Sequence, residues 1–410
     1  MPMPTPASTP HVVLFTGHSS YGVLSHLTTD LARAFISTGA TAEIVDLARV
    51  AVATEFRRIQ REGRVAFFCA FSGYGLDLTS GNVLLYDVMN VPYLGLLLDN
   101  PCYFPSRHFR ASDNLLLLHG DDGHHAVSAE VSPVNSWRGL FRLASSPWTE
   151  PAAPLAERAA TALFASKGGD PQQYESWLLR AMPAPAARFI FDVAADLGAQ
   201  HTPQRVWEVA RRHAAARGTH TGFATATFYH ELVRHADHLA RLRRATAVAR
   251  ALQALPVTFV GGEWSHVRTK KSRSTFLPPA PLPAVRRLMA ESSVTINVQP
   301  GTTDSLHDRL ILGLHAGAAV VSDTNDVIDE IVGRDAFHCW DGDPAGIADL
   351  VAATLREPHT HQAAADRGQS RAREALTMTR LARHLLDVVQ WQRTLRGTTP
   401  AVAARALQVA

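Results

Sequence analysis

Short apolar runs, separated by glycine-rich or polar loops, recur through the first part of the chain. The first covers residues 11–16, and Leu24, Leu27, Leu31 and Phe35 then follow at helical spacing. Further apolar runs lie at residues 42–45, 65–71, 93–98 and 115–118. These runs are apolar throughout rather than alternating, which is typical of parallel strands covered by helices on both faces. We therefore predict a doubly wound parallel α/β domain over residues 11–150.

A second series of apolar runs follows a cluster of Pro and Ala at residues 147–154, which we interpret as a linker. The strands predicted from this series lie at residues 162–165, 257–260, 294–298, 318–322 and 337–340. They indicate a second doubly wound domain over residues 155–375. Between its first two strands, residues 171–255 form a long helical insertion.

The clearest helix of this insertion carries Phe228, Leu232, Leu239 and Leu242 on one apolar stripe. Three arginines, Arg241, Arg243 and Arg244, lie off that stripe. They form either a solvated helix face or a patch that contacts phosphate.

Composition excludes several classes of protein. The 410 residues include 40 Lys and Arg against 37 Asp and Glu, and this small net charge of +3 argues against nucleic acid as the main partner. Three cysteines without a CxxC pair exclude a disulfide scaffold and a zinc ribbon. No apolar run reaches about 18 residues, so no membrane span is expected. Residues 1–10 are rich in Pro and Thr, have no secretory signal pattern and are expected to be a disordered leader; we expect a cytoplasmic protein.

Polar or glycine-rich loops follow the predicted strands of the first domain. They cover residues 17–22, 72–75, 99–101 and 119–123. Ligands of doubly wound sheets bind beyond the carboxyl ends of the strands, so these loops are candidate binding segments. The residues Asp121, Asp122, His124 and His125 offer oxygen and imidazole donors to a metal, but no second cluster completes a site, and we predict no bound metal.

The most informative segment covers residues 293–323, where a strand ends in Asn-x-x-Pro and a polar loop precedes a helix bearing an arginine. This segment resembles the donor-binding segment of GT-B glycosyltransferases, in particular the branch related to spore-maturation-type and family-1-like transferases. The matched residues are Asn297, Pro300, Arg309, Ala316, Gly317 and Asp323. The resemblance implies two Rossmann-like domains that face a cleft. It also implies a terminal helix over residues 376–396 that returns to the first domain, followed by a tail at 397–410.

The resemblance places a nucleotide-sugar site in the second domain. The residues expected to bind the donor are Lys167, Gly261, Gly262, Gly301, Thr302, Thr303, His307 and Arg309. Backbone N–H groups at residues 301–303, just before a helix, suit a diphosphate, and Arg309 offers a planar fork to phosphate. The paired glutamates of many retaining GT-B enzymes are absent around this helix, so no ribose-binding glutamate is assigned.

The first domain is expected to bind the acceptor. Its acceptor-side residues are Gly17, Ser19, Tyr21, Gly73 and Tyr74. An inverting reaction requires a general base, for which we choose Asp99 first, because an apolar run delivers it to the sheet edge, and His18 second. His119, Asp121 and Asp122 also follow strands and are further candidates for the base. For each of these candidates, and for Asp99, the alternative to a catalytic role is that the residue forms a turn or caps a helix.

We therefore predict a glycosyltransferase that moves a sugar from a nucleotide-diphosphate sugar to a hydroxyl or other nucleophile, without a metal or cofactor. The acceptor is a glycan, a small metabolite or a protein, and neither the base and sugar of the donor nor the stereochemistry is specified. Two alternatives on the same fold are a sugar-nucleotide epimerase or hydrolase and a non-catalytic nucleotide-sugar-binding protein.

Overall fold

The computed structural model describes residues 9–131, 137–199, 204–218, 227–299 and 301–398. The matched Pro300, most of the leader and residues 399–410 of the tail lie outside these ranges, as do residues 200–203 and 219–226 of the insertion. Two compact units are present. The first comprises Met1–Gly120, His124–Arg142 and Thr377–Ala410, and the second comprises Asp121–Gly123 and Leu143–Leu376.

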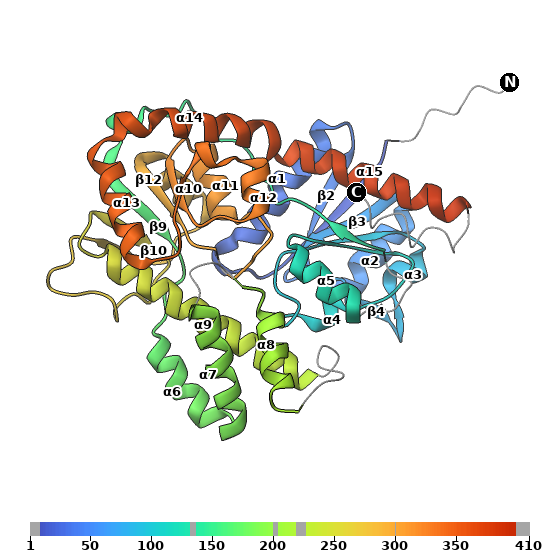
Figure 1. The fold of residues 1–410 in the computed structure, drawn as a ribbon. Coiled ribbons are helices and arrows are strands. Elements are labelled where there is room, and N and C mark those ends of the chain that lie inside the picture. The colour runs from blue at the N-terminus through green and yellow to red at the C-terminus, as the bar shows by residue number, and fades with distance from the viewer. Residues whose placement is uncertain (1–8, 132–136, 200–203, 219–226, 300, 399–410) are drawn as a thin grey trace. The chain divides into compact units, whose positions relative to one another are not determined.

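The first unit contains a six-stranded parallel sheet in the order β2-β1-β3-β6-β7-β8 (Figure 1). Its strands are β1 (His11–Thr16), β2 (Thr41–Asp46), β3 (Val65–Phe71), β6 (Tyr93–Leu97), β7 (Leu115–His119) and β8 (Trp137–Leu140). Leu14 of the central strand β1 pairs with Ile44 on one side and Cys69 on the other. The order reverses at β1 and β3, so the loops that follow these two strands occupy the switch point of this sheet.

Helices connect and cover these strands. They are η1 (Ser20–Gly22), α1 (Val23–Ser37), α2 (Val52–Glu62), α3 (Leu85–Met89), α4 (Pro105–His108), α5 (Asp122–Val131) and α15 (Met378–Thr398), and a short hairpin pairs β4 (Thr79–Ser80) with β5 (Val83–Leu84). On α1, the predicted spacing buries Leu27, Leu31 and Phe35. The last helix, α15, packs against α1. Within the core, Phe15 and Phe68 stack with ring centroids 5.3 Å apart.

The second unit contains another six-stranded parallel sheet, in the order β11-β10-β9-β12-β13-β14. Its strands are β9 (Ala159–Ala165), β10 (Val257–Val260), β11 (Thr275–Leu277), β12 (Ser292–Asn297), β13 (Ala319–Ser322) and β14 (His338–Cys339). Counted along this unit, the strand order is 3-2-1-4-5-6, the order of dinucleotide-binding sheets, with its switch point between β9 and β12. The predicted α/β class with two doubly wound parallel sheets is confirmed.

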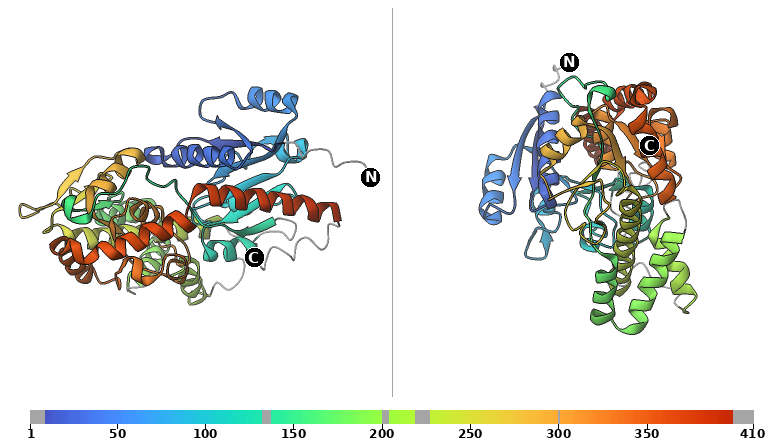
Figure 2. Two further views of the ribbon diagram at one scale, coloured as in Figure 1. Left: turned by 90° about the horizontal axis from the view of Figure 1, so that it is seen from above. Right: turned by 90° about the vertical axis from the view of Figure 1, so that its left-hand side faces the viewer.

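The helices of the second unit form two groups. Those near the sheet are η2 (Leu155–Glu157), α10 (Leu282–Glu291), α11 (Asp308–His315), α12 (Asp326–Ile331), η3 (Arg334–Ala336), α13 (Pro344–Arg356) and α14 (Pro358–Ala375). Those between β9 and β10 are α6 (Pro171–Ala181), α7 (Ala184–Ala199), α8 (Val206–Ala215) and α9 (Thr227–Leu252). In Figure 2, as in Figure 1, the green α6–α8 protrude from the sheet of their unit, whereas the far end of α9 lies on it.

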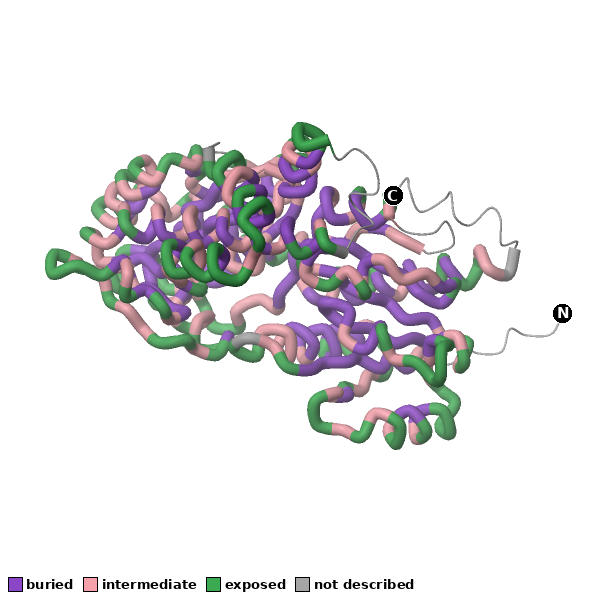
Figure 3. Tube along the Cα trace, turned by 90° about the horizontal axis from the view of Figure 1, so that it is seen from below, coloured by how far each residue is buried: buried purple, intermediate pink, exposed green. Residues whose placement is uncertain are grey.

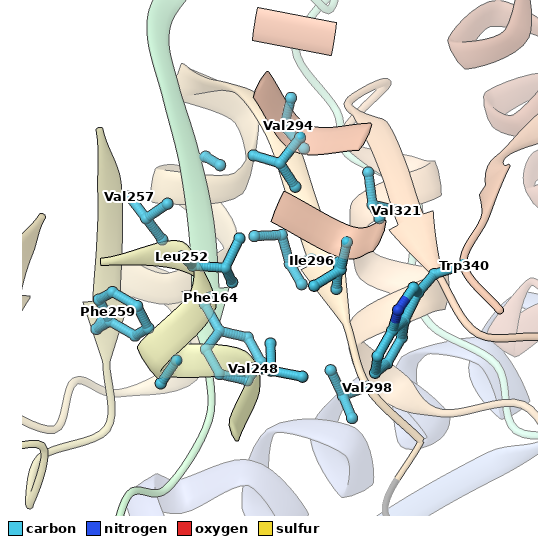
Figure 4. Packing of buried hydrophobic residues seen from close by; sticks show 14 of the residues in the cluster. Phe164, Val248, Leu252, Val257, Phe259, Val294, Ile296, Val298, Val321 and Trp340 are labelled. Carbon is cyan, nitrogen blue, oxygen red and sulfur yellow. The ribbon is translucent and has the colours of Figure 1, made fainter. Parts of the chain in front are cut away.

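The core of the second unit joins α9 to the sheet. Val248 and Leu252 of α9 pack with Phe164 of β9, Phe259 of β10 and Ile296 of β12, and each of these side chains is almost fully buried (Figure 4). Burial follows the strands of both units, whereas the outer helix faces and loops are exposed (Figure 3). Because α9 packs so closely on the strands, it takes the place of the helix that follows strand 1 in a dinucleotide-binding sheet.

The structure differs from the sequence analysis at one helix position and at two edge strands. Phe228, placed on the apolar stripe of α9, is 59% exposed, although Leu232, Leu239 and Leu242 on that stripe are buried. Two edge strands, β8 and β11, were not predicted, because edge strands are short and their composition is mixed. Among the described residues, no helix has the length and apolar character to cross a membrane.

Candidate functional site

A pocket of about 630 Å³ opens at the carboxyl ends of β9 and β12, the switch point of the second sheet. Three segments of the chain surround it: the loop after β9, the loop after β12 and the interior of α9. Helix α7 adds a wall of small and apolar side chains. Ligands of open parallel sheets bind at such switch points, so this pocket is the candidate ligand site of the unit.

The pocket is strongly cationic. Among the described residues, the pocket is lined by five cationic side chains, Lys167, Arg241, Arg243, Arg244 and Arg309, and by one carboxylate, that of Asp237. A concave surface with this charge excess attracts an anionic ligand. Arginine forks and a lysine ammonium together suit phosphate oxygens.

Lys167 lies in the loop that follows β9, with an exposed side chain and no ion pair to a described residue. The backbone of this loop is fixed by glycines: the N–H of Gly168 donates to the Gly262 carbonyl at 3.2 Å. A Cβ on Gly261 would lie 2.2 Å from the Ser166 carbonyl oxygen, and one on Gly168 would lie 2.6 Å from the Gly262 oxygen. Gly261 and Gly262 therefore allow the two loop backbones to pack closely and so position the Lys167 loop, but they are not among the pocket-lining residues.

Arg309 connects the two strand ends that form the switch point. Its guanidinium donates to the Ala165 carbonyl at 3.2 Å and to the Val298 carbonyl at 2.7 Å, and its Nε donates to His307 Nδ1 at 3.2 Å. A guanidinium has five N–H groups, so two remain without a partner among the described residues. Arg309 therefore holds the two strand ends together and also lines the pocket.

The arginines of α9 are oriented by carboxylates. Arg241 pairs with Asp237 at 2.7 Å, Arg243 with Glu175 at 2.9 Å, and Arg244 with Asp323 at 2.7 Å. Burial raises the pKa of Asp323, an effect that Arg244 and the Gln299 backbone N–H oppose. Asp323 therefore holds the loop after β12 and helix α9 together at the pocket.

The segment expected to present backbone N–H groups is arranged differently from the prediction. Helix α11 begins at Asp308, so residues 301–303 do not form its first turn. Gly301 lines the pocket, whereas the Thr303 N–H donates to Asp121 at 3.1 Å and the Thr302 hydroxyl to Gln299 at 3.3 Å. His307 is the N-cap of α11, and its pKa is lowered by burial.

The acceptor-side residues predicted in the first unit lie together at its switch point. The Tyr74 hydroxyl, after β3, donates to the His18 carbonyl after β1, and the Tyr74 ring packs on Gly17. Arg107 lies over the Tyr74 ring, 5.0 Å from its centroid. The Ser19 hydroxyl accepts a hydrogen bond at 3.2 Å from the Leu24 N–H, in the first turn of α1. The loops after β1 and β3 are thus joined by one tyrosine.

Asp99 belongs to the same edge of that sheet. Its carboxylate is exposed and accepts a hydrogen bond from the Ser72 hydroxyl at 3.1 Å. Ser72 precedes Tyr74 by two residues in the loop after β3. Arg107 donates to the Ser72 carbonyl at 2.7 Å, and its side chain packs on Gly73. The His18 side chain and Tyr21 are exposed in the loop after β1. Within the described ranges, no group of three or more His, Cys, Asp or Glu is arranged to hold a metal ion.

Arg241, Arg243 and Arg244 line the pocket, although the sequence analysis did not assign them to the donor site. The sequence placed these arginines on the helix outside its apolar stripe. A patch that contacts phosphate was one of the two explanations left open for them. The structure shows that Arg241, Arg243 and Arg244 all line the pocket, so they are not a solvated face remote from it.

Comparisons with known proteins agree with this architecture. Residues 234–387 match a family model described as glycosyl transferase-like. An alpha-glucosyltransferase in complex with UDP-glucose and DNA has a TM-score of 0.53 at 8% identity, covering 93% of this chain and 100% of its own. Sucrose-phosphate synthase from Thermosynechococcus elongatus has a TM-score of 0.50 at 10% identity, covering 95% and 100%. No curated protein sequence matches the chain.

These comparisons show the fold of the chain and a family match over part of it. The chain has the GT-B fold, and its residues 234–387 carry the glycosyl transferase-like segment, which includes β12, α11 and most of α9. The residues around Arg309 that resemble a glycosyltransferase segment lie within this match.

Proposed function

We propose that this protein transfers a sugar from a nucleotide-diphosphate sugar to a nucleophile of an acceptor, without a metal ion or a cofactor. The observation that carries this proposal is the cationic pocket at the switch point of a sheet with dinucleotide-binding strand order. UDP or UDP-glucose is present in the alpha-glucosyltransferase structures that share the fold. Fixed cations around a leaving diphosphate supply the stabilisation that a metal ion supplies elsewhere.

In this proposal, the second unit binds the donor. Lys167 and Arg309 contact the phosphates, and Gly261 and Gly262 hold the Lys167 loop in position. The first unit binds the acceptor on the loops joined by Tyr74, and Asp99 removes the proton from the attacking hydroxyl. His18 is the second choice for this base.

Lys167→Ala is expected to weaken nucleoside diphosphate binding about tenfold, because one charge-assisted contact is lost from an otherwise intact site. Isothermal titration calorimetry with a panel of nucleoside diphosphates measures the dissociation constants. Lys270→Ala is the matched control, since Lys270 is an exposed lysine outside the pocket. The same titration in EDTA is expected to be unchanged. Absence of binding by the parent protein to every diphosphate would sink the proposal.

Asp99→Asn is expected to lower kcat by roughly 10²- to 10⁴-fold while the donor KM stays within threefold, because an amide cannot accept the proton. The assay follows a radiolabelled sugar from its nucleotide donor into fractions of a cell extract. Asp77→Asn, an exposed carboxyl in the same unit, is the control. An unchanged kcat would remove Asp99 from the mechanism. Donor breakdown without any labelled acceptor would favour a hydrolase, and binding without turnover a non-catalytic protein.

A further inference from the structure

The helix ends nearest the switch point are already occupied by side chains of the chain itself. Helix α6 follows the Lys167 loop, but its first residue, Pro171, has no N–H. The carboxylate of Asp170 caps this helix and accepts the Gln172 N–H at 2.9 Å. A carboxylate at this end repels a phosphate that would otherwise bind there.

The second candidate helix, α11, is capped in the same way. Asp308 lies in its first turn and accepts the Arg309 N–H at 2.7 Å, and His307 Nδ1 accepts the same N–H at 3.2 Å. Its amino end is therefore neutralised by a carboxylate. The positive charge of a phosphate site in this unit has to come from side chains.

Helix α9 supplies such side chains because its interior, rather than its end, passes the switch point. Pocket-lining residues of α9 run from Asp237 to Ala247, well inside a helix that begins at Thr227 and ends at Leu252. Interior N–H groups of a helix bond to the carbonyl four residues earlier and cannot bind a ligand. Arg241 and Arg244, three residues apart, project from one side of the helix.

Both arginines are held in defined orientations. Asp237, which is buried, pairs with Arg241, and a Cβ added to Gly301 would lie 3.0 Å from Asp237 Oδ1. Arg244 pairs with the buried Asp323, and its guanidinium lies 5.2 Å from the centroid of the Trp340 ring. A buried carboxylate thus orients each guanidinium, and both arginines line the pocket with Lys167 and Arg309.

We infer that Arg241 and Arg244 of α9 bind the two neighbouring phosphates of the donor, in the role that a helix amino terminus has in other dinucleotide-binding sheets. This inference deepens the proposed function and rests on it. Two guanidinium forks a helical turn apart suit a diphosphate better than a single phosphate. Asp237 pairs with Arg241 and also lines the pocket, so its carboxylate competes with the donor phosphate for Arg241 and lowers the affinity for the donor.

Binding of inorganic pyrophosphate and of inorganic phosphate, measured by isothermal titration calorimetry, tests the inference. Pyrophosphate is expected to bind more tightly than phosphate. Arg241→Ala and Arg244→Ala are each expected to weaken pyrophosphate binding roughly 10- to 100-fold. Arg250→Ala is the matched control, since Arg250 is an exposed arginine of α9 outside the pocket, and it is expected to leave the affinity unchanged.

Asp237→Asn gives a readout that a purely structural role would not move. It removes the competing carboxylate and is expected to strengthen pyrophosphate binding several-fold, whereas damage to the structure would weaken it. If Arg244→Ala does not fold, Arg244→Lys keeps the charge beside Asp323 but loses the fork, and it is expected to bind pyrophosphate at least fivefold more weakly.

The outcomes separate the two proposals. Failure of the parent protein to bind pyrophosphate and every nucleoside diphosphate overturns both. If the parent binds but the Arg241 and Arg244 variants bind as well as Arg250→Ala, the role of α9 is overturned and the donor site stands. Unchanged or weakened pyrophosphate binding by Asp237→Asn overturns the competing role of Asp237.

Discussion

Gly261→Ala is expected to lower the free energy of unfolding by about 4 kcal/mol. The new Cβ would lie 2.2 Å from the Ser166 carbonyl oxygen and 2.7 Å from its carbon, both backbone atoms of the neighbouring loop. Overpacking and strain at φ +135° contribute roughly 1–3 kcal/mol each. Because this loop carries Lys167, nucleoside diphosphate binding is expected to weaken too. Chemical denaturation and calorimetric titration measure the two effects.

Gly63→Ala is the control for this change. Gly63 also has a positive φ, +63°, but nothing lies within 4 Å of the position of its Cβ, so only the backbone penalty of about 1 kcal/mol remains. Equal losses for the two variants would show that the close approach of the loops after β9 and β10 is unimportant for stability.

The second large effect is a loss of stability at acidic pH. Four histidines lie close together at β7 in the first unit: His108 from α4, His119 from β7, and His124 and His125 from α5. The ring centroid of His119 lies 5.4 Å from that of His108 and 5.6 Å from that of His125. Both ring nitrogens of His119 are buried and make no hydrogen bond to the part of the chain that the structure describes. Burial lowers the pKa values of His108 and His119 far below the ordinary value, and the neighbouring histidines and Arg138 lower both further.

Stability is therefore expected to fall as the pH drops below about 6.5. The unfolded chain binds protons at these histidines from that pH downward, whereas the folded chain does not. Each such histidine contributes a slope of up to about 1.4 kcal/mol per pH unit. His119→Leu is expected to reduce this slope without loss of stability at neutral pH, because it replaces an unsatisfied ring with an apolar side chain.

Urea denaturation at a series of pH values between 4 and 8 measures the slopes. His384→Gln, an exposed histidine of α15, is the control and is expected to keep the parent slope. Buried histidines of the second unit, such as His315 with its pKa lowered to about 4, contribute equally to both variants. A His119→Leu slope equal to that of the parent would contradict the prediction.

Local patterns were sufficient for most of the fold. The runs at residues 11–16, 65–71 and 257–260 are strands with those same bounds, because strands buried on both faces are continuously apolar. Strand β11, Thr275–Leu277, has three residues at a sheet edge and no such pattern. The exposure of Phe228 could not be predicted from the sequence either. Periodicity indicates which residues share a helix face, but it does not indicate where the packing of that face ends.

The site was predictable only where one segment carries it. Lys167 lies in the loop directly after β9, and Arg309 lies in α11, the helix that follows β12, so the general position of strand ends pointed to both. Arg241 and Arg244 reach the same pocket from α9, more than 70 residues beyond Lys167, and this meeting depends on how α9 packs on the sheet. The amino end of α11 was misjudged by a few residues because Asp308, not the threonines, supplies its first turn.

The order of segments along the chain has one consequence for the evolution and engineering of this protein. Apart from Asp121–Gly123, the second unit is one continuous segment: the chain leaves the first unit after Arg142 and re-enters it at Thr377, so this segment is an insert within the first unit. The Ser145 N–H donates to the Leu376 carbonyl at 3.1 Å, so the two ends of the insert meet. Modules with adjoining ends can be exchanged between hosts or circularly permuted at little cost in chain entropy. Residues 143–376 are therefore suited to transfer, as one segment, into another host protein.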